Sequence, residues 1–115
     1  GVFGMKNLLR KFKNGTSIAL MIDQRVSEGI KSNFFEKQAF TTTIPAQFVK
    51  KYKSKIVPVY IERLENDEFV IKFQEPLVFN EIENIETITN NLNKIIEKMI
   101  MNNPEQWIWT HNRWK

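Results

Sequence analysis

Three consecutive polar residues, Asp23-Gln24-Arg25, directly follow a nearly all-apolar run at residues 16–22. An apolar run without polar alternation is typical of a strand covered on both faces, as in a parallel sheet. In an open α/β sheet the ligand crevice lies just beyond the carboxyl ends of the strands. We therefore expect Asp23, Gln24 and Arg25 to contact a ligand. The alternative is a surface turn with an incidental charge pair.

The only histidine, His111, is a candidate general base, but Glu105 is the only carboxylate near it in the sequence. A base that acts on a hydroxyl needs a carboxylate to orient it, so a structural role is the more common one. His111 lies in a tail that holds all three tryptophans. If this tail is helical, Trp107, His111 and Trp114 share one face. The tail then either seats at a membrane interface or caps the core.

Residues 26–43 show neither helical nor strand periodicity, which predicts a long loop. Long loops in compact domains are functional or disordered, and phenylalanines argue against disorder. Phe34, Phe35 and Phe40 either plug the core from outside or line an apolar cleft. Thr41-Thr42-Thr43 then begins a helix, with Thr43 as N-cap and Pro45 in the first turn.

The remaining elements position these residues. Helical spacing of apolar residues predicts helices over 5–13, stopped by Asn14-Gly15, and over 81–101. Residues 55–61 read as a buried strand in which Pro58 must lie at an end, a bulge or an unpaired edge. Residues 60–73 read as a hairpin, with 69–73 half exposed. Helices alternating with strands predict an α/β fold with a mixed sheet flanked by helices.

Composition excludes several classes of function. The 115 residues fit one domain, and 42% apolar with 26% charged residues is a globular mixture. The absence of cysteine excludes disulfide scaffolds, cysteine-bound zinc and thiol nucleophiles. The glycines fit no nucleotide-binding fingerprint, and no serine elbow, zinc helix or calcium loop occurs. The longest apolar runs are far shorter than the roughly 20 residues of a membrane span.

The net charge of +4 is distributed unevenly. Residues 1–63 carry 12 Lys/Arg against 4 Asp/Glu, whereas residues 64–103 carry 3 against 8. A basic side predicts an anionic partner, and nucleic acid, anionic lipid and an acidic protein are all eligible; the alternative is that the lysines only keep the protein soluble. Of the 17 basic residues 13 are lysine, which disfavours sequence-reading contacts to nucleic acid. We expect no nucleic-acid partner.

The order of these motifs resembles that of the bacterial lipid A biosynthesis acyltransferases of the lauroyl/myristoyl type, within the glycerolipid acyltransferase superfamily. The resemblance covers most of the chain, and the Trp-rich ending carries it most strongly. The residues concerned are Ile22-Asp23-Gln24-Arg25, Gly29, Phe34-Phe35, Ala39-Phe40-Thr41-Thr42-Thr43-Ile44-Pro45-Ala46, Ile56-Val57-Pro58-Val59-Tyr60 and Pro104-Glu105-Gln106-Trp107-Ile108-Trp109-Thr110-His111-Asn112-Arg113-Trp114-Lys115.

The resemblance implies transfer of a fatty acyl chain from acyl carrier protein to a lipid A precursor, at the cytoplasmic face of the inner membrane of a Gram-negative cell. It implies a layered α/β fold and no metal or other cofactor. Partners would be acyl carrier protein, the lipid A precursor and the membrane surface. Asp23 would support catalysis, and Arg25 would face an acceptor phosphate. The substrate-binding set would be Asp23, Gln24, Arg25, Phe34, Phe35, Thr41, Thr42 and Thr43.

The chain also departs from the family. The family's catalytic block is His-x-x-x-x-Asp/Glu, and no Asp or Glu follows the single His111. Glu36 stands where the family usually has glycine after the paired phenylalanines. With Gly1 rather than Met at the start, we expect residues 1–115 to be the C-terminal part of one acyltransferase domain, lacking the N-terminal anchor and catalytic block and inactive alone. The alternative is a non-enzymatic module of the same fold that binds anionic lipid or protein.

Overall fold

The longest helix, α3 (Ile85–Asn102), organises the chain in this computed structural model, which describes residues 2–115. It starts at Ile85 because the Asn84 side chain accepts a hydrogen bond from the Thr87 amide at 2.8 Å. The helix predicted over 81–101 is confirmed, with its start moved to this cap. Four aliphatic residues one turn apart form its buried stripe: Ile88, Leu92, Ile96 and Ile100.

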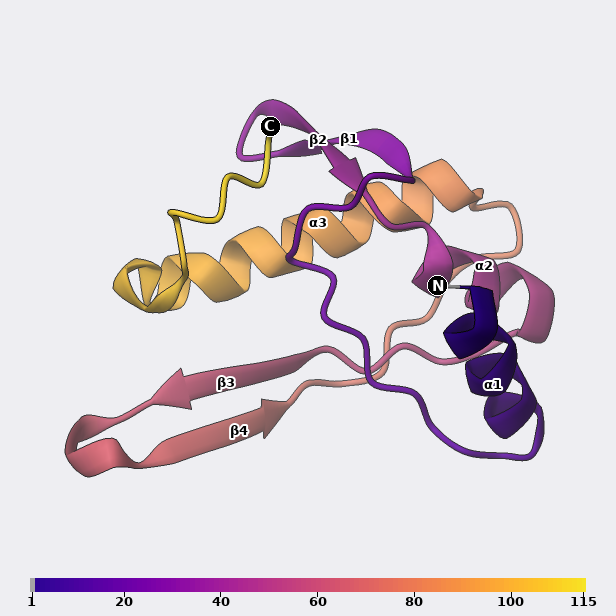
Figure 1. Ribbon diagram of the computed structural model, residues 1–115, viewed down its shortest axis with the longest axis horizontal. Helices are drawn as coiled ribbons and strands as arrows, with labels where there is room; N and C mark the ends of the chain where they lie inside the picture. Colours follow the sequence, from indigo (N-terminus) through magenta and orange to yellow (C-terminus); the bar gives the residue numbers. More distant parts are fainter. Residues whose placement is uncertain (1) are drawn as a thin grey trace.

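A tight hairpin, β1 (Ile30–Phe34) and β2 (Lys37–Thr41), packs on α3 (Figure 1). The predicted loop over 26–43 is therefore wrong. The strands bury alternate residues, but two of those four are the hydroxyl residues Ser32 and Thr41, so apolar periodicity was hidden. The two-residue turn places Phe35 and Glu36 at φ values of 48° and 61°, so Glu36 makes the turn without the glycine that the resemblance implies at this position.

Two shorter helices, α1 (Val2–Lys13) and α2 (Ile44–Tyr52), lie together at one end of the molecule (Figure 1). The Phe12 ring of α1 contacts Phe48 and Tyr52 of α2, with centroids 4.7 and 5.3 Å apart. Both predicted helices are confirmed, and so is the Gly15 stop, at φ 87°. Thr43 is the N-cap of α2, but its side chain accepts from Gln47 at 2.7 Å instead of capping the helix.

Residues 16–22 do not form the predicted strand but run as an extended, unpaired segment across the molecule (Figure 1). The run is not covered on both faces, since Met21 is 81% exposed. Its anchor is Ile22, which packs against both buried clusters of the core. The parallel sheet expected around this run is also wrong. Within residues 2–115 both sheets are antiparallel pairs of strands.

The second hairpin consists of β3 (Val59–Arg63) and β4 (Phe69–Phe73), joined through the 3-10 turn η1 (Glu65–Asp67). The hairpin prediction is confirmed, and Pro58 lies immediately before β3, as a strand-end proline should. The strand expected from residue 55 begins only at Val59, and it is not covered on both faces, because alternate residues are exposed. Ile56 makes a single bridge to Leu77.

Three helices with two antiparallel hairpins confirm the predicted α/β class. The core consists of a cluster between β1–β2 and the second half of α3 and a cluster between α2 and the first half. None of the helices in residues 2–115 has the length and apolar character that a membrane span requires.

Candidate functional site

The C-terminal tail lies against the β1–β2 hairpin in a series of turns after η2 (Pro104–Gln106). Trp107 and Trp114 pack on the buried Phe34, with ring centroids 5.7 and 5.5 Å away. The Trp114 indole also donates to the Phe34 carbonyl at 2.8 Å. These two tryptophans therefore cap the core. Because the tail is not helical, the expected alignment of Trp107, His111 and Trp114 on one helix face does not occur.

The predicted polar residues 23–25 lie beside this tail, more than 80 positions away in sequence. The Asp23 carboxylate accepts a hydrogen bond from the Trp107 indole at 3.2 Å. The Arg25 amide donates to Nε2 of His111 at 3.4 Å, and the Arg25 guanidinium donates to the Lys115 carbonyl at 3.3 Å. Gln24 is exposed. The site predicted at the end of a strand thus lies between an extended segment and the tail.

Arg113 is the central residue that sequence reasoning missed. Its side chain is fully buried, although it lies two residues from the end of the chain's C-terminal tail. The guanidinium donates to the Thr41 hydroxyl at 2.9 Å and to the Phe40 carbonyl, and it lies 5.3 Å from the centroid of the Phe34 ring. Burial lowers the pKa of the Arg113 guanidinium, and the negative charge of Asp23 opposes that shift. The hydrogen bond from Trp107 to Asp23 couples the extended segment to the tail, and Arg113 couples the tail to β2.

Asn93 of α3 completes this buried group from the opposite side. Its amide nitrogen donates to the Ser32 hydroxyl at 2.9 Å and to the Thr41 hydroxyl at 3.1 Å. Thr41 thus accepts hydrogen bonds from both Asn93 and Arg113, which fixes β2 between helix and tail. Thr89 and Asn93, one turn apart on α3, are both buried beside the apolar stripe, and the sequence held no signal that distinguishes them from exposed polar residues of the helix.

The other predicted site residues do not all lie beside the tail. Phe34 is a core residue, as the plug interpretation predicts, whereas Phe35 borders an open hollow of about 460 Å³. Thr42 and Thr43 serve the start of α2, since their hydroxyls accept from the Ile44 amide at 3.3 Å and from Gln47. The structure therefore brings Asp23, Arg25, Phe34 and Thr41 around the tail, but it joins neither Thr42 nor Thr43 to them by a hydrogen bond.

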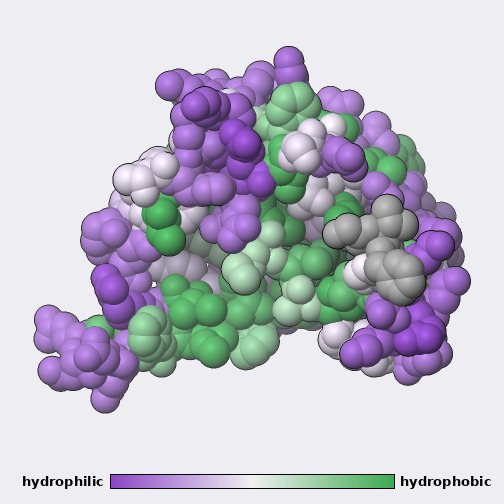
Figure 2. Space-filling view, viewed as in Figure 1, coloured by the Kyte–Doolittle hydropathy of each residue, from purple (hydrophilic) through white to green (hydrophobic). Residues whose placement is uncertain are grey.

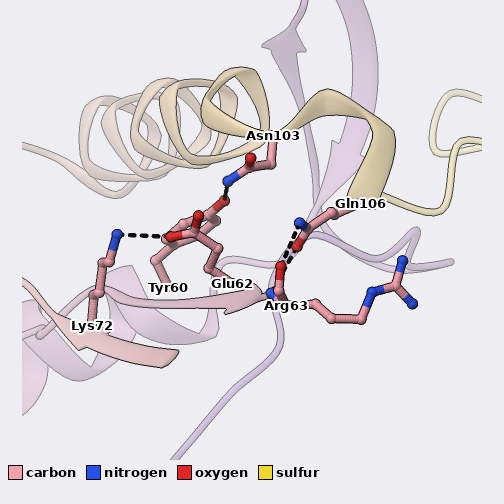
Figure 3. A network of polar contacts seen from close by, with 6 residues as sticks. All are labelled: Tyr60, Glu62, Arg63, Lys72, Asn103 and Gln106. Atoms are coloured by element: carbon pink, nitrogen blue, oxygen red, sulfur yellow. Dashed lines mark hydrogen bonds and ion pairs between the residues drawn. The ribbon is translucent and has the colours of Figure 1, made fainter. Parts of the chain in front are cut away.

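A second polar network fixes the tail to the β3–β4 hairpin (Figure 3). The Gln106 side chain exchanges two hydrogen bonds of 2.9 Å with the backbone of Arg63, as a neighbouring strand would. Asn103 donates to the Tyr60 hydroxyl at 2.6 Å. Lys72 and Glu62 form an ion pair at 2.8 Å on the same face. One tail thus connects both hairpins to α3.

Across residues 2–115 the sequence matches the family described as bacterial lipid A biosynthesis acyltransferase. The chain belongs to this family. The resemblance carried by the ordered motifs and the Trp-rich tail is therefore confirmed. No curated protein matches the sequence.

The family indicates a lipid A acyltransferase-type function, so the structure can be searched for the base that such a transfer requires. His111 is exposed, and its Nε2 accepts from the Arg25 amide. Among the described residues His111 forms no ion pair or hydrogen bond with a carboxylate. It therefore lacks the carboxylate partner of a catalytic base, and its contact to residue 25 serves to hold the two segments together.

Proposed function

We propose that this chain is the C-terminal part of an acyltransferase that transfers a fatty acyl chain from acyl carrier protein to a lipid A precursor in lipopolysaccharide biosynthesis. The reaction would take place at the cytoplasmic face of the inner membrane of a Gram-negative cell. The base that activates the acceptor hydroxyl would come from a His-x-x-x-x-Asp/Glu block outside these 115 residues. The chain alone would then bind substrate without turning it over.

The observation that carries this proposal is the match of the whole described chain to an acyltransferase family, combined with a sequence that has no such block. Acyl transfer to a hydroxyl proceeds through a base that takes the hydroxyl proton, while the acyl carbonyl is attacked and the thiol of the donor leaves. No pair of residues in the described chain supplies that base with its orienting carboxylate. The catalytic step therefore needs groups from elsewhere.

The role we assign to this part is recognition of the acceptor. The Arg25 guanidinium is exposed and can pair with a phosphate on the acceptor, because arginine presents paired donors to phosphate oxygens. Its backbone is held by His111 and its side chain reaches the Lys115 carbonyl, so two contacts to the tail fix its position. The excess of positive charge in residues 1–63 favours approach of acyl carrier protein and of anionic lipid.

An acyl-transfer assay with acyl carrier protein as donor tests the proposal. The 115-residue chain should show no turnover, and sustained transfer by the purified chain would disprove the fragment interpretation. A phosphorylated lipid A precursor in neutral vesicles should still bind. Arg25→Ala should weaken this binding about tenfold, whereas Arg63→Ala, at another exposed arginine, should not. Binding that is the same for vesicles with and without the precursor would instead support a general module for anionic lipid.

A further inference from the structure

Arg113 lies in the middle of the contact between the C-terminal tail and residue 25. The two tail residues that bond to Arg25 are His111 and Lys115, and each lies two positions from Arg113. The Arg113 side chain itself is buried, and its guanidinium donates to two acceptors of β2. We propose that Arg113 is a positioning residue for acceptor binding, a role that rests on the proposed function: it holds the tail so that the Arg25 guanidinium is oriented toward an acceptor phosphate.

The anchor of the tail consists of buried groups. Arg113 is fully buried and donates to the Thr41 hydroxyl at 2.9 Å. Thr41 is buried as well, and Asn93 of α3 donates to the same hydroxyl at 3.1 Å. The next residue, Trp114, adds a hydrogen bond of 2.8 Å from its indole to the Phe34 carbonyl of β1. The tail is therefore attached to the buried core at two adjacent residues.

This anchor does not depend on which surfaces of the chain are free. Apolar residues gather over the β3–β4 hairpin (Figure 2), but a chain that is part of a larger domain, as proposed, exposes surface that the rest of the domain can cover. A group that is buried within residues 2–115 stays buried when further chain packs outside it. We therefore expect the link from the core through Arg113 to residue 25 in the whole acyltransferase as well as in this chain.

The chemistry of the guanidinium suits positioning better than packing alone. Arginine presents its donors in one rigid plane, so its bonds to β2 fix the direction of the tail as well as its distance. Burial lowers the pKa of Arg113, the negative charge of Asp23 opposes this shift, and Nε has no hydrogen-bond partner within residues 2–115. An apolar side chain would fill the same space without this cost, but it could not direct the tail.

Without the anchor, we expect Arg25 to lose its orientation while it keeps its charge. Its two hydrogen bonds to the tail are long, 3.4 Å from its amide to Nε2 of His111 and 3.3 Å from its guanidinium to the Lys115 carbonyl. Such weak contacts persist only while the tail is held in place. A long side chain that must first be ordered loses affinity by roughly two- to tenfold.

Binding of a phosphorylated lipid A precursor in neutral vesicles tests the inference. Arg113→Met should raise the dissociation constant about fivefold, against the roughly tenfold expected for Arg25→Ala. In the Arg25→Ala background, Arg113→Met should change the dissociation constant by less than about twofold, because no guanidinium is left to orient. With the same precursor lacking its phosphates, the variants should bind like the wild type.

The matched control for lost stability is Ile88→Ala, since Ile88 is fully buried in the other cluster of the core, against α2. It should leave binding unchanged at a temperature where circular dichroism shows every variant to be folded. If Arg113→Met does not fold, Arg113→Lys replaces it, because lysine keeps the charge but not the paired donors. Its expected loss of affinity is about threefold.

NMR relaxation of the chain without ligand measures the positioning directly. The heteronuclear NOE of the Arg25 amide should fall in Arg113→Met, while that of Ile96 in α3 stays at the value of ordered backbone. In Ile88→Ala both values should remain as in the wild type. An Arg25 amide that is equally ordered in Arg113→Met and in the wild type overturns the inference, whatever the binding assay gives.

The two sets of variants distinguish failure of this inference from failure of the proposed function. If Arg25→Ala weakens binding and Arg113→Met does not, or if the two effects multiply in the double variant, Arg113 does not position Arg25 and the inference is overturned. If Arg25→Ala binds like the wild type, the acceptor role of Arg25 fails, and with it the role of Arg113 in binding the acceptor.

Discussion

Replacing Arg113 by methionine tests whether the buried guanidinium holds the tail on the β1–β2 hairpin. Methionine keeps much of the length and apolar contact of the arginine stem but removes the charge and the donors. Two hydrogen bonds disappear, one to the Thr41 hydroxyl at 2.9 Å and one to the Phe40 carbonyl. The contact to the Phe34 ring at 5.3 Å is lost as well.

The expected loss of stability is the difference between opposing contributions to the free energy of unfolding. Each hydrogen bond from a charged donor contributes about 1.5–3 kcal/mol, and the cation–π contact adds about 0.5–2 kcal/mol. Against this, the uncharged side chain avoids a desolvation cost of several kcal/mol. We expect Arg113→Met to lower the free energy of unfolding by about 3 kcal/mol, a large fraction of the roughly 5–15 kcal/mol typical of a domain. The urea midpoint should then fall by about 2 M.

Urea unfolding followed by tryptophan fluorescence measures this loss, since Trp107 and Trp114 report on the contact to Phe34. The control is Arg25→Met, at an exposed arginine, which should change stability by less than about 0.5 kcal/mol. Arg113→Lys should fall between the two, because a single ammonium cannot reproduce the paired donors. If Arg113→Met unfolds like Arg25→Met, the tail is not held through this guanidinium, and the reasoning is refuted.

Three further substitutions test the backbone and the surface electrostatics. Glu36→Gly should stabilise the chain by about 0.5–1 kcal/mol in thermal unfolding, because glycine relieves the positive φ of 61° at this turn; a loss of stability would contradict the turn geometry. Gly29→Ala should destabilise the chain by about 3 kcal/mol, because the added β-carbon would lie 2.2 Å from the Thr41 carbonyl oxygen of β2. The control is Gly4→Ala, at an open position of a helix, which should stabilise the chain by about 0.5 kcal/mol. Lys72→Met should raise the pKa of Glu62 in an NMR titration, because the hydrogen bond from Lys72 lowers that pKa. Since the pKa of Glu62 is lowered and that of Lys72 is raised by the pair, its stabilising effect should be present between about pH 4.5 and 10.5. This stabilisation should be lost as pH falls through the folded-state pKa of Glu62 or rises through that of Lys72. A Glu62 titration that is unchanged in Lys72→Met would exclude the ion pair.

Hydrophobic periodicity was sufficient to predict those helices and strands that are specified by their own residues. The helices at 2–13 and 85–102 carry an apolar stripe and an end signal, Gly15 in one case and Asn84 in the other. The hairpin at 59–73 shows alternation in β4 and turn residues between the strands. The order of polar, aromatic and Trp-rich motifs was also sufficient to identify the family, because that order is a property of the sequence alone.

Periodicity failed where burial is decided by distant partners. The β1–β2 hairpin buries Ser32 and Thr41 in place of large apolar residues, and these hydroxyls are acceptable in the core because Asn93 donates to both of them and Arg113 donates to Thr41. Residues 16–22 are apolar enough for a strand, yet no strand within residues 2–115 pairs with them.

The sequence by itself determined the helices, the second hairpin and the family, and it predicted a candidate site at residues 23–25. Only the tertiary structure showed that this site lies against the tail and that Arg113 is buried beneath it. The hydrogen bonds that decide this, from Arg113 to Thr41 and from Trp107 to Asp23, join residues 72 and 84 positions apart. Local propensity acts over a few turns of helix or a single hairpin, so contacts at such separations arise only when the whole core packs.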